Sequence, residues 1–390
     1  MATIEIAKRA ATRPTWAEVS LANLRHNFAV LERHLKVGVT ICAVVKADAY
    51  GHGAVECARA LEEEGATWLG VTSLDEAIPL REAGVRARIL LMTGFWRGEE
   101  EEIVRLGLTP TVWEFGQIEQ LERAATRLGV AKHSIHLKVD TGMGRLGVAL
   151  EDLSGVWSVL KSSSHLFLEG LSTHLASSEV LDATSVPEQL SAFEQVRRKL
   201  RAEGFEPPLI HAANTGAVIS RPEAIYNMVR PGIALYGYHL PFERAGREVN
   251  GSGLRLPLVP VLTWKTRILS LRDARAHQPL GYGGIYVTKA PARIAVLPVG
   301  YADGFNRHLS THGRVIVREH YAPIVGRISM DLTLVDVTGL PGVSVGDEAV
   351  LLGSSDGLSV DAREHAALAD TVVYEILCGI SKRVPRRHSR

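Results

Sequence analysis

Lys46 stands at the end of the apolar segment VTICAVVK (39–46), where a buried strand is expected to meet a loop. Partial desolvation at such a position lowers the pKa of a lysine and increases the fraction of neutral amine. A neutral amine can form a Schiff base with the carbonyl of a cofactor or substrate. A strand-end lysine can equally reach solvent, and this position alone does not decide between the two interpretations.

A second lysine, Lys138, lies in SIHLKVD (134–140), where apolar and polar residues alternate. The apolar set should face covering helices, which places Lys138 in the interior. A buried ammonium needs a partner or must lose its charge. Asp140 is one candidate partner, and Arg145 follows on a glycine-rich turn.

Three later segments also place polar residues at the ends of apolar runs. His174 ends FLEGLSTH, Asn214 and Thr215 begin a short helical stretch, and Arg230 and Gly232 end NMVRPG. A helix N-terminus attracts anions, although an ordinary helix cap explains the Asn-Thr pair as well. The last two segments together favour a phosphate site, because barrels often bind phosphate on the loops after strands seven and eight. A single histidine is more often a packing residue.

A repeated unit positions these residues: an apolar run followed by a helical pattern. Eight such units in about 220 residues predict a (β/α)8 barrel, an α/β fold with its working groups at the carboxyl ends of the strands. A doubly wound open sheet is the alternative. The runs are 39–46, 67–73, 87–94, 108–113, 134–140, 167–174, 209–214 and 227–232, and the clearest helical patterns are 21–35, 54–64, 74–84, 115–129 and 186–204.

The pattern changes after a polar stretch rich in glycine and proline, PFERAGREVNGSGLRLP (241–257). Beyond it, short β-type segments alternate with turn residues, and only 361–379 has a helical pattern. We therefore expect a barrel domain over 14–245 and a mostly β domain over 246–390. Residues 1–13 can pack with the second domain.

Composition excludes several classes of protein. The 390 residues are 46% hydrophobic and 22% charged, an ordinary globular mixture with a net charge of +1, which favours neither nucleic acid nor an anionic membrane as a partner. Cys42, Cys57 and Cys378 are too few and too scattered for a disulfide framework or a CxxC metal site, so we expect no metal. No signal-peptide pattern or bilayer-length apolar stretch is present, which predicts a cytoplasmic location.

Nine segments resemble, in order, motifs of the alanine racemase family, whose members use pyridoxal 5′-phosphate (PLP) on a fold-type-III scaffold. The resemblance runs from about residue 14 to residue 387, and the family has an N-terminal barrel and a C-terminal β domain, as predicted above. The segments are AVVKADAYGHG, HLKVDTGMGRLG, THLASSE, HAANTGAV, MVRPGIALYG, GYGGIYV, PVGYADGFNR, GRISMDLTLVDV and YEILCGISKRVPR.

The resemblance implies a role for each barrel residue. Lys46 carries PLP covalently, His174 packs beside the ring, and Arg145 donates to its phenolic oxygen. Arg230 faces the pyridine nitrogen; since arginine can only donate, that nitrogen stays unprotonated and the cofactor becomes a weaker electron sink. Lys138 matches a position carbamylated in many members, where the resulting anion can pair with Arg145. The phosphate contacts are Tyr50, Thr215, Gly232, Ile233 and Tyr374, with Asn214 nearby.

Racemisation needs a proton removed from one face of the substrate and delivered to the other, which favours two acid/base groups. By resemblance these are Lys46 and Tyr282, the tyrosine coming from the second subunit of a homodimer. A tyrosine has a pKa near 10 and needs cationic neighbours to act as a base, a field that His174 and Arg230 can supply. The backbone of Met330 binds the substrate carboxylate, and the corridor to the site is formed by Tyr301, Asp303, Arg307 and Asp331.

The expected activity is interconversion of L- and D-alanine, supplying D-alanine for cell-wall peptidoglycan. The segment SMDL departs from the family's common CMDQ at Ser329 and Leu332, and GYGG also differs from the usual pattern, so substrate preference is open. The alternatives are a broader or serine-type amino-acid racemase, a PLP-dependent decarboxylase of similar architecture, and a non-catalytic PLP-binding protein.

Overall fold

The computed structural model describes residues 13–249 and 251–389 and divides into two compact units. The first unit comprises Asn23–Val259. The second joins the chain from Pro260 onward to the segment that ends at Ala22. Each unit is described by itself below.

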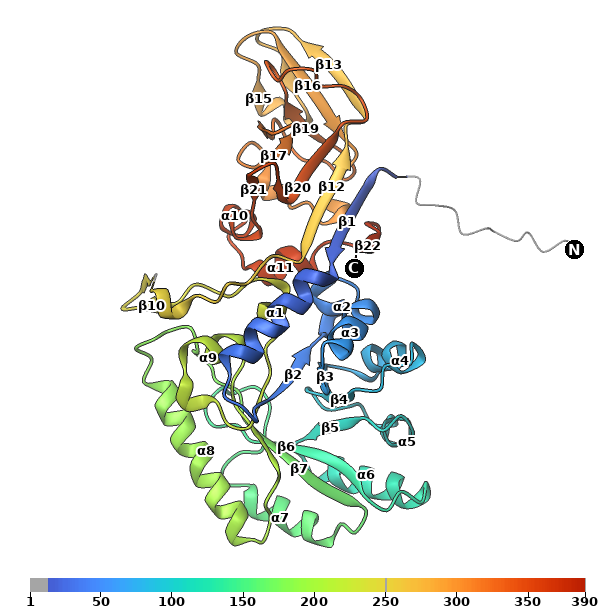
Figure 1. Cartoon of the computed structure of the whole chain (residues 1–390), viewed down its shortest axis with the longest axis vertical. Helices are drawn as coiled ribbons and strands as arrows, with labels where there is room; N and C mark the ends of the chain where they lie inside the picture. The colour runs from blue at the N-terminus through green and yellow to red at the C-terminus, as the bar shows by residue number, and fades with distance from the viewer. Residues whose placement is uncertain (1–12, 250, 390) are drawn as a thin grey trace, which may run out of the picture. The chain divides into compact units, whose positions relative to one another are not determined.

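Eight parallel strands form one sheet in the first unit, in the order β8-β7-β6-β5-β4-β3-β2-β9 (Figure 1). Each strand arises from one of the eight predicted apolar runs, so the barrel prediction is confirmed and the doubly wound alternative is wrong. The strands are β2 (Thr40–Val44), β3 (Trp68–Val71), β4 (Arg88–Leu91), β5 (Thr109–Val112), β6 (His133–Lys138), β7 (Leu166–Ser172), β8 (Leu209–His211) and β9 (Met228–Val229).

Strands β8 and β9 do not pair as a regular ladder. The side chain of Asn227 and one backbone hydrogen bond link them instead. Asn227 accepts from the backbone nitrogen of Ile210 (2.7 Å) and donates to the carbonyl of Pro208 (2.6 Å). The backbone nitrogen of Arg230 donates to the carbonyl of Ala213 (2.9 Å). The Asn227 bonds join the starts of the two strands, and the bond between Arg230 and Ala213 brings together the loops that follow the seventh and eighth strands of the barrel.

Helices lie outside the strands (Figure 1), and those such as α4 bury one face. In α4, the hydroxyl of Ser73 accepts from the backbone nitrogen of Glu76 and caps the helix, while Leu74, Ala77 and Leu80 are buried at helical spacing. The helices are α1 (Leu21–His34), α3 (Ala54–Glu63), α4 (Leu74–Glu82), α5 (Glu100–Arg105), α6 (Phe115–Arg127), α7 (Leu153–Ser162), α8 (Ser185–Ala202) and α9 (Thr215–Ser220). The segment labelled α2 (Lys46–Gly51) is a left-handed turn.

The second unit is built mainly from two sheets whose strands pair antiparallel, except for the parallel pair β1–β22 at one edge of the larger sheet. The larger has the strand order β18-β17-β20-β12-β1-β22 with β21 beside β20, and the smaller has the order β13-β16-β19. Their strands are β1 (Thr15–Ser20), β12 (Leu262–Arg267), β13 (Ser270–Ala274), β16 (Ala292–Leu297), β17 (Arg314–Val317), β18 (His320–Pro323), β19 (Thr333–Asp336), β20 (Glu348–Ser355), β21 (Leu358–Val360) and β22 (Arg386–Ser389).

The domain boundaries differ from those expected from the sequence. Strand β1 pairs with β12 and β22, so residues assigned to the barrel domain from position 14 onward begin in the β-rich unit. At the other end the first unit continues to Val259 rather than ending at 245. A single short strand does not reveal its sheet partners in its own sequence, which explains the difference. The expected packing of residues 1–13 falls mostly outside the described residues.

Two smaller predictions also acquire detail. The stretch 241–257 contains a small hairpin, β10 (Glu243–Arg244) and β11 (Arg247–Glu248). The helical pattern at 361–379 forms two helices, α10 (Ala362–Leu368) and α11 (Val373–Cys378). Among the helices of the described chain, none combines the length and apolar character that a bilayer crossing requires.

Candidate active site

Lys46 begins a left-handed turn directly after strand β2. The four residues Ala47, Asp48, Ala49 and Tyr50 all have φ of 53–54° and ψ of 39–50°. This conformation costs a non-glycine residue roughly 1–2 kcal/mol, so four in succession need support from their surroundings. Strain of this kind is typical of functional positions, and here it lies beside the candidate lysine.

Side chains on both flanks hold the turn in place. A carboxylate oxygen of Glu76 accepts from the backbone nitrogen of Ala47 (2.6 Å), and its other oxygen accepts from the backbone nitrogen (2.7 Å) and hydroxyl (2.8 Å) of Thr72. Asp48 accepts from the backbone nitrogen of Ala54 (2.7 Å), which closes the far side of the turn. The turn is therefore fixed by charge-assisted hydrogen bonds.

Tyr50, Thr215 and Gly232 come together from three separate segments. The hydroxyl of Thr215 accepts from the backbone nitrogens of Gly232 (3.0 Å) and Ala234 (3.4 Å). A Cβ at position 232 would collide with the Tyr50 hydroxyl, so only glycine allows this approach. Asn214 caps the short helix α9 that Thr215 begins. Hydroxyl and N–H groups gathered in this way suit a phosphate.

Arg230 is a buried guanidinium, 8% exposed, at the end of the last barrel strand. It donates to the carbonyls of Thr173 (2.8 Å) and Ala212 (3.1 Å), to Nδ1 of His211 and to Nδ1 of His174 (3.4 Å). None of these bonds uses its Nε. Burial lowers the pKa of Arg230 to about 10, which still leaves it protonated at neutral pH.

Two buried histidines extend this contact through the barrel interior. Because Arg230 can only donate, Nδ1 of His211 must accept, which places the proton of a neutral His211 on Nε2. That nitrogen lies 2.9 Å from Nδ1 of His136, so His136 in turn carries its proton on its own Nε2. This last nitrogen lies 3.9 Å from Glu169, which forms a bidentate pair with Arg88. The donors thus all point away from Arg230.

Burial keeps these rings neutral. It lowers the pKa of His136 and of His174 to about 3 each, with Arg230 adding a repulsive positive charge, and it lowers that of His211 well below 6.5. His174 is therefore neutral near pH 7 and does not supply the positive charge expected to assist Tyr282, because its charged form would be both desolvated and repelled. Arg230 alone of that pair is charged.

Lys138 lies in the barrel interior, 9% exposed, as predicted from the alternation in its strand. Burial, together with the positive charges of Arg230, Arg145 and Lys46, lowers its pKa to about 8, while Asp140 opposes the shift. Within the described residues Lys138 forms no ion pair; Asp140 instead accepts from the backbone of Gly142 and Met143. The amine is thus partly neutral and has several cations near it, and the Lys138–Asp140 pair, one of the two alternatives left open by the sequence, does not form.

The remaining predicted residues lie in the β-rich unit. Tyr282 (71% exposed), Met330 (53%) and Tyr301 (44%) are exposed, whereas Asp303 is fully buried. Asp303 is therefore not a corridor-lining residue in this unit, because its carboxylate is enclosed by other side chains. Arg307 lies in a single 3-10 turn (Arg307–Leu309), Asp331 follows Met330, and Tyr374 lies on α11.

The roles of several groups of this site were not predicted from the sequence. His136 and His211 lie in two of the predicted strand segments, and the alternation that places Lys138 in the interior also places His136 there. Glu169 and Arg88 carried no such signal, because only the tertiary structure brings strands β4 and β7 to one ion pair.

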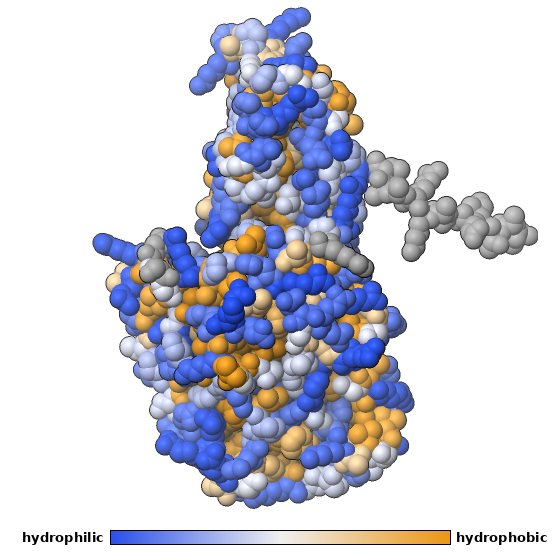
Figure 2. All heavy atoms as spheres, viewed as in Figure 1, coloured by the Kyte–Doolittle hydropathy of each residue, from blue (hydrophilic) through white to orange (hydrophobic). Residues whose placement is uncertain are grey.

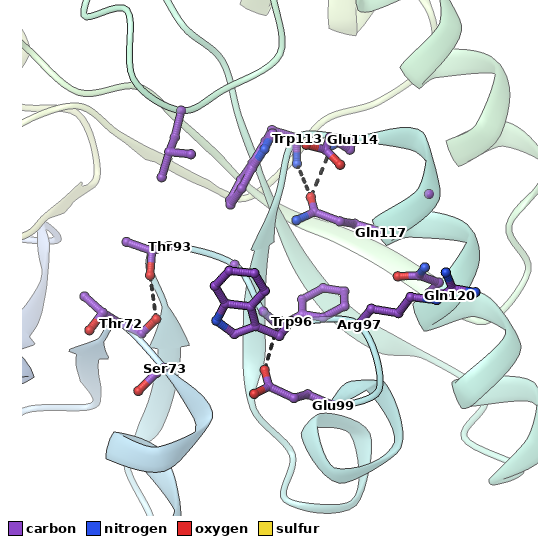
Figure 3. Close-up of a pocket in the computed structure, with 14 residues that line it drawn as sticks. Thr72, Ser73, Thr93, Trp96, Arg97, Glu99, Trp113, Glu114, Gln117 and Gln120 are labelled. Atoms are coloured by element: carbon purple, nitrogen blue, oxygen red, sulfur yellow. Dashed lines mark hydrogen bonds between the residues drawn. The ribbon is translucent and has the colours of Figure 1, made fainter.

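A cavity of about 550 Å³ lies on the same rim of the barrel, beside the loops that follow β3, β4 and β5 (Figure 3). Trp96, 80% exposed, donates its backbone N–H to Glu99 (2.9 Å), and Gln117 accepts from the backbone nitrogens of Trp113 (2.9 Å) and Glu114 (3.2 Å). Leu146, from the loop after β6, completes its wall, and none of the candidate site residues lines it.

A barrel whose first strand ends in a lysine, followed by a β-rich unit, defines the class of fold-type-III barrel enzymes. Models of the N-terminal and C-terminal domains of alanine racemase match residues 19–240 and 261–388. The chain therefore belongs to the alanine racemase family.

Individual relatives agree over almost the whole chain. It is 42% identical to the alanine racemase of Sorangium cellulosum, with 96% of this chain and 98% of the relative covered, and 42% identical to that of Halothermothrix orenii, with 97% of each covered. Among solved structures, alanine racemase from a D-cycloserine-producing Streptomyces lavendulae has a TM-score of 0.88 at 32% identity, covering 98% of each chain. Alanine racemase from Bartonella henselae with covalently bound pyridoxal phosphate has a TM-score of 0.82 at 29% identity, covering 96% of this chain and 99% of that one.

Proposed function

We propose that this chain is a PLP-dependent isomerase that interconverts L- and D-alanine. The observation that carries the proposal is the strained turn at Lys46, which brings Tyr50 to Thr215 and Gly232 at one end of the barrel. A lysine beside a set of phosphate-type donors is the chemistry that an aldehyde cofactor with a phosphate requires.

The barrel residues fit the cofactor on two counts. The Tyr50 hydroxyl lies directly against the backbone of Gly232, where any Cβ would collide with it, so glycine is required to keep the Tyr50 hydroxyl beside the N–H groups of this segment. The hydrogen bonds of Arg230 to Thr173, His174, His211 and Ala212 use its Nη atoms, so its Nε–H group can donate to an unprotonated ring nitrogen. When bound, PLP withdraws electrons from the substrate Cα and so makes its proton removable.

The chain's own residues then bind, orient and move protons. Lys46 would hold the cofactor covalently, and its Nζ would carry the proton on one face of the substrate. The phenolic oxygen of Tyr282 would carry it on the other face, handling L-alanine while Lys46 handles D-alanine. Thr215, Gly232, Ile233 and Tyr50, with Tyr374 and Asn214, would hold the phosphate.

We also propose that Lys138 is carbamylated. Its amine is partly neutral, and only a neutral amine can add carbon dioxide. The product is an anion among the cations Arg145, Arg230 and Lys46, which replaces repulsion by attraction. An anionic Lys138 would pair with Arg145 and hold its guanidinium toward the cofactor's phenolic oxygen.

The active form is proposed to be a homodimer with shared sites. The β-rich unit exposes Tyr282, Ile285, Val287 and Met330 by 45–71%, and Figure 2 shows orange surface among the blue on this part of the molecule. Aromatic and methionine side chains are enriched at protein interfaces. A second copy would bring Tyr282 and the Met330 backbone to the substrate, with Tyr301 and Arg307 along its corridor.

The direct test is racemisation of alanine by the purified protein, with spectra recorded before and after borohydride. We expect conversion in both directions and loss of the cofactor's visible band on reduction. Rates on serine, lysine and arginine test the broader racemase, and carbon dioxide release from ornithine or lysine tests the decarboxylase. A colourless protein that takes up no PLP would contradict the proposal. We further propose that the enzyme works in the cytoplasm and supplies D-alanine for peptidoglycan, with no nucleic-acid or membrane partner.

A further inference from the structure

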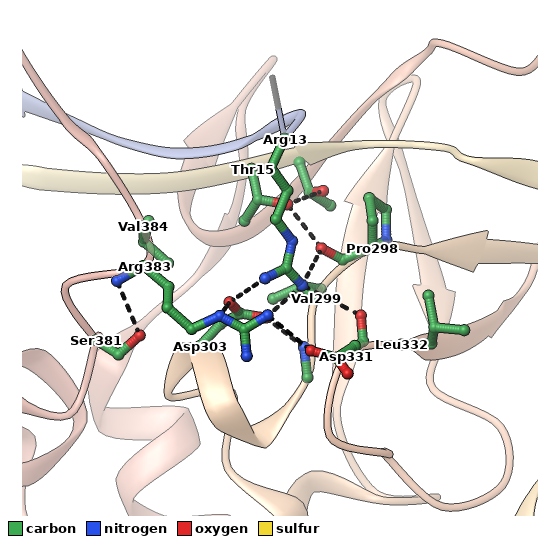
Figure 4. A network of polar contacts seen from close by, with 12 residues as sticks. Arg13, Thr15, Pro298, Val299, Asp303, Asp331, Leu332, Ser381, Arg383 and Val384 are labelled. Atoms are coloured by element: carbon green, nitrogen blue, oxygen red, sulfur yellow. Dashed lines mark hydrogen bonds and ion pairs between the residues drawn. The ribbon is translucent and has the colours of Figure 1, made fainter. Parts of the chain in front are cut away.

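The buried carboxylate of Asp303 is clamped by arginines from opposite ends of the chain (Figure 4). Arg13 donates from Nη1 to Oδ1 (2.7 Å) and from Nη2 to Oδ2 (2.8 Å), a bidentate pair. Nε of Arg383 lies 3.5 Å from the same carboxylate. The side chain of Asp303 is 1% exposed, whereas that of Arg13 is 26% exposed. A buried charge with this geometry is strongly dependent on its partners.

The same arginines also hold the neighbouring turn, Ser329–Leu332. Nη2 of Arg13 donates to the backbone carbonyl of Asp331 (3.3 Å), and Nη2 of Arg383 donates to its carboxylate (2.7 Å). The cluster therefore contains two positive and two negative side chains, and its net charge is zero. We call Arg13, Asp303, Asp331 and Arg383 the arginine clamp.

Backbone hydrogen bonds connect the arginine clamp to Met330. Asp303 accepts from the backbone nitrogen of Gly300 (2.9 Å), and the next two nitrogens donate to the carbonyls of Ser329 (3.0 Å) and Met330 (3.1 Å). A Cβ at position 300 would collide with those carbonyls. The turn closes itself as well, because the Ser329 hydroxyl accepts from the backbone nitrogen of Leu332 (3.0 Å) and donates to its carbonyl (2.9 Å).

None of the bonds that hold the turn uses the N–H group of Met330, the group assigned to the substrate carboxylate under the proposed function. We propose that Arg13 is a positioning residue for substrate binding: it fixes the Ser329–Leu332 turn so that this N–H is presented before substrate arrives. The proposal rests on the proposed function. It assigns Asp303 the role of a buried structural residue in place of the expected role in the substrate corridor. Preformed donors bind an anion without the cost of ordering the loop.

The test compares Arg13→Gln and Arg13→Lys with the wild-type holoenzyme. Lysine keeps the charge and loses the bidentate geometry, so it should restore binding only in part. We expect KM for L-alanine to rise about tenfold in R13Q and less in R13K, with a smaller fall in kcat. A tenfold change is the size expected when one hydrogen-bond donor, here the Met330 N–H group, is no longer well placed for the substrate carboxylate.

A second readout does not depend on turnover. Amide hydrogen exchange of the peptide covering 326–333 should become faster in both variants, more so in R13Q, in protein without substrate. Arg314→Gln is the matched control, because Arg314 also makes a bidentate pair with a carboxylate, Glu364, in the same unit. It should leave KM and the exchange of 326–333 unchanged.

The possible failures are distinguishable. Unchanged exchange at 326–333 in both Arg13 variants overturns the clamp, whatever the wild-type activity. A KM within twofold of wild type in R13Q overturns the role in substrate binding, and so does an equal rise in R314Q, which would indicate general destabilisation. A wild-type protein that does not racemise alanine refutes the proposed function and with it the substrate role, while the exchange result still decides whether Arg13 orders the turn.

Discussion

Arg230 shows how one residue type sets the electronic state of a site. A guanidinium cannot accept a hydrogen bond, so any ring nitrogen facing it must stay unprotonated. Its burial is tolerated because carbonyls and the rings of His211 and His174 take up its donors. The low pKa of His136 keeps the far end of this chain of bonds neutral as well.

At the residue scale, Lys46→Ala should abolish the visible absorption of bound cofactor and nearly all racemisation, because no other amine holds the covalent position. Absorption spectra and a racemisation assay after dialysis against PLP measure both effects. Lys36→Ala, which removes an exposed lysine, is the control. Normal turnover in K46A would refute the cofactor assignment.

A second residue-scale prediction concerns pH. The pKa of His136 is about 3 in the fold against about 6.5 when unfolded, so the unfolded chain binds the proton first as the pH falls. The contribution of neutral His136 to the free energy of unfolding is fully present above about pH 6.5. Below that pH the free energy of unfolding decreases by up to about 1.4 kcal/mol per pH unit because of this histidine. Urea unfolding at pH 7, 6 and 5 should therefore show a shallower loss of stability in His136→Gln than in wild type.

The exposed His312→Gln is the matched control for removing an imidazole. An identical pH slope in H136Q and wild type would mean that His136 is not held neutral by burial. Histidine ¹⁵N spectra of the same proteins would test the inferred tautomers, with the proton on Nε2 of both His136 and His211.

At the element scale, the left-handed turn at Ala47–Tyr50 sets the position of Lys46 relative to the phosphate-type donors. Its four residues contain no glycine, so local preference opposes the conformation. Carboxylates from Glu76 and Asp48 stabilise it by accepting backbone N–H groups. The geometry of the site therefore depends on side chains that contact neither cofactor nor substrate.

Glu76→Gln should lower the free energy of unfolding by about 1–3 kcal/mol, because the charge that accepts from Ala47 and Thr72 is lost. It should also weaken PLP binding, since the turn carrying Lys46 and Tyr50 is less well fixed. Thermal unfolding and a PLP titration measure the two effects. Glu99→Gln, which removes a carboxylate bonded to the exposed Trp96 loop, should change neither by much.

At the scale of the whole molecule, the two proposed proton carriers belong to different units. Lys46 lies in the barrel unit, and Tyr282 lies exposed on the β-rich unit. If a second copy supplies the tyrosine, each active site of a dimer draws one group from each chain. Two inactive variants can then restore one intact site when they are combined in a dimer, which is impossible if each site is built from one chain.

Mixing Lys46→Ala and Tyr282→Phe dimers and allowing the subunits to exchange should restore activity. In a mixed dimer one site carries both substitutions and the other carries neither, so a statistical mixture should recover about one quarter of the wild-type rate. Each variant alone, treated identically, should stay near zero. No recovery despite proven exchange of subunits would place both groups in a single chain.

The sequence alone determined the eight strands, the order of the units and the lysine at the end of the first strand. Apolar periodicity and strand ends are local properties, and they are sufficient to predict these features. The resemblance then supplied the residues expected at the site, of which Tyr50, Thr215 and Gly232 lie together in the fold.

Only the tertiary structure decided the histidine chain from Arg230 to Glu169, the clamp on Asp303 and the membership of β1 in the β-rich unit. Each depends on side chains or strands far apart in sequence, whose meeting is set by strand register and packing. It also placed four non-glycine residues in a left-handed turn against their local preference, since surrounding carboxylates outweigh that preference.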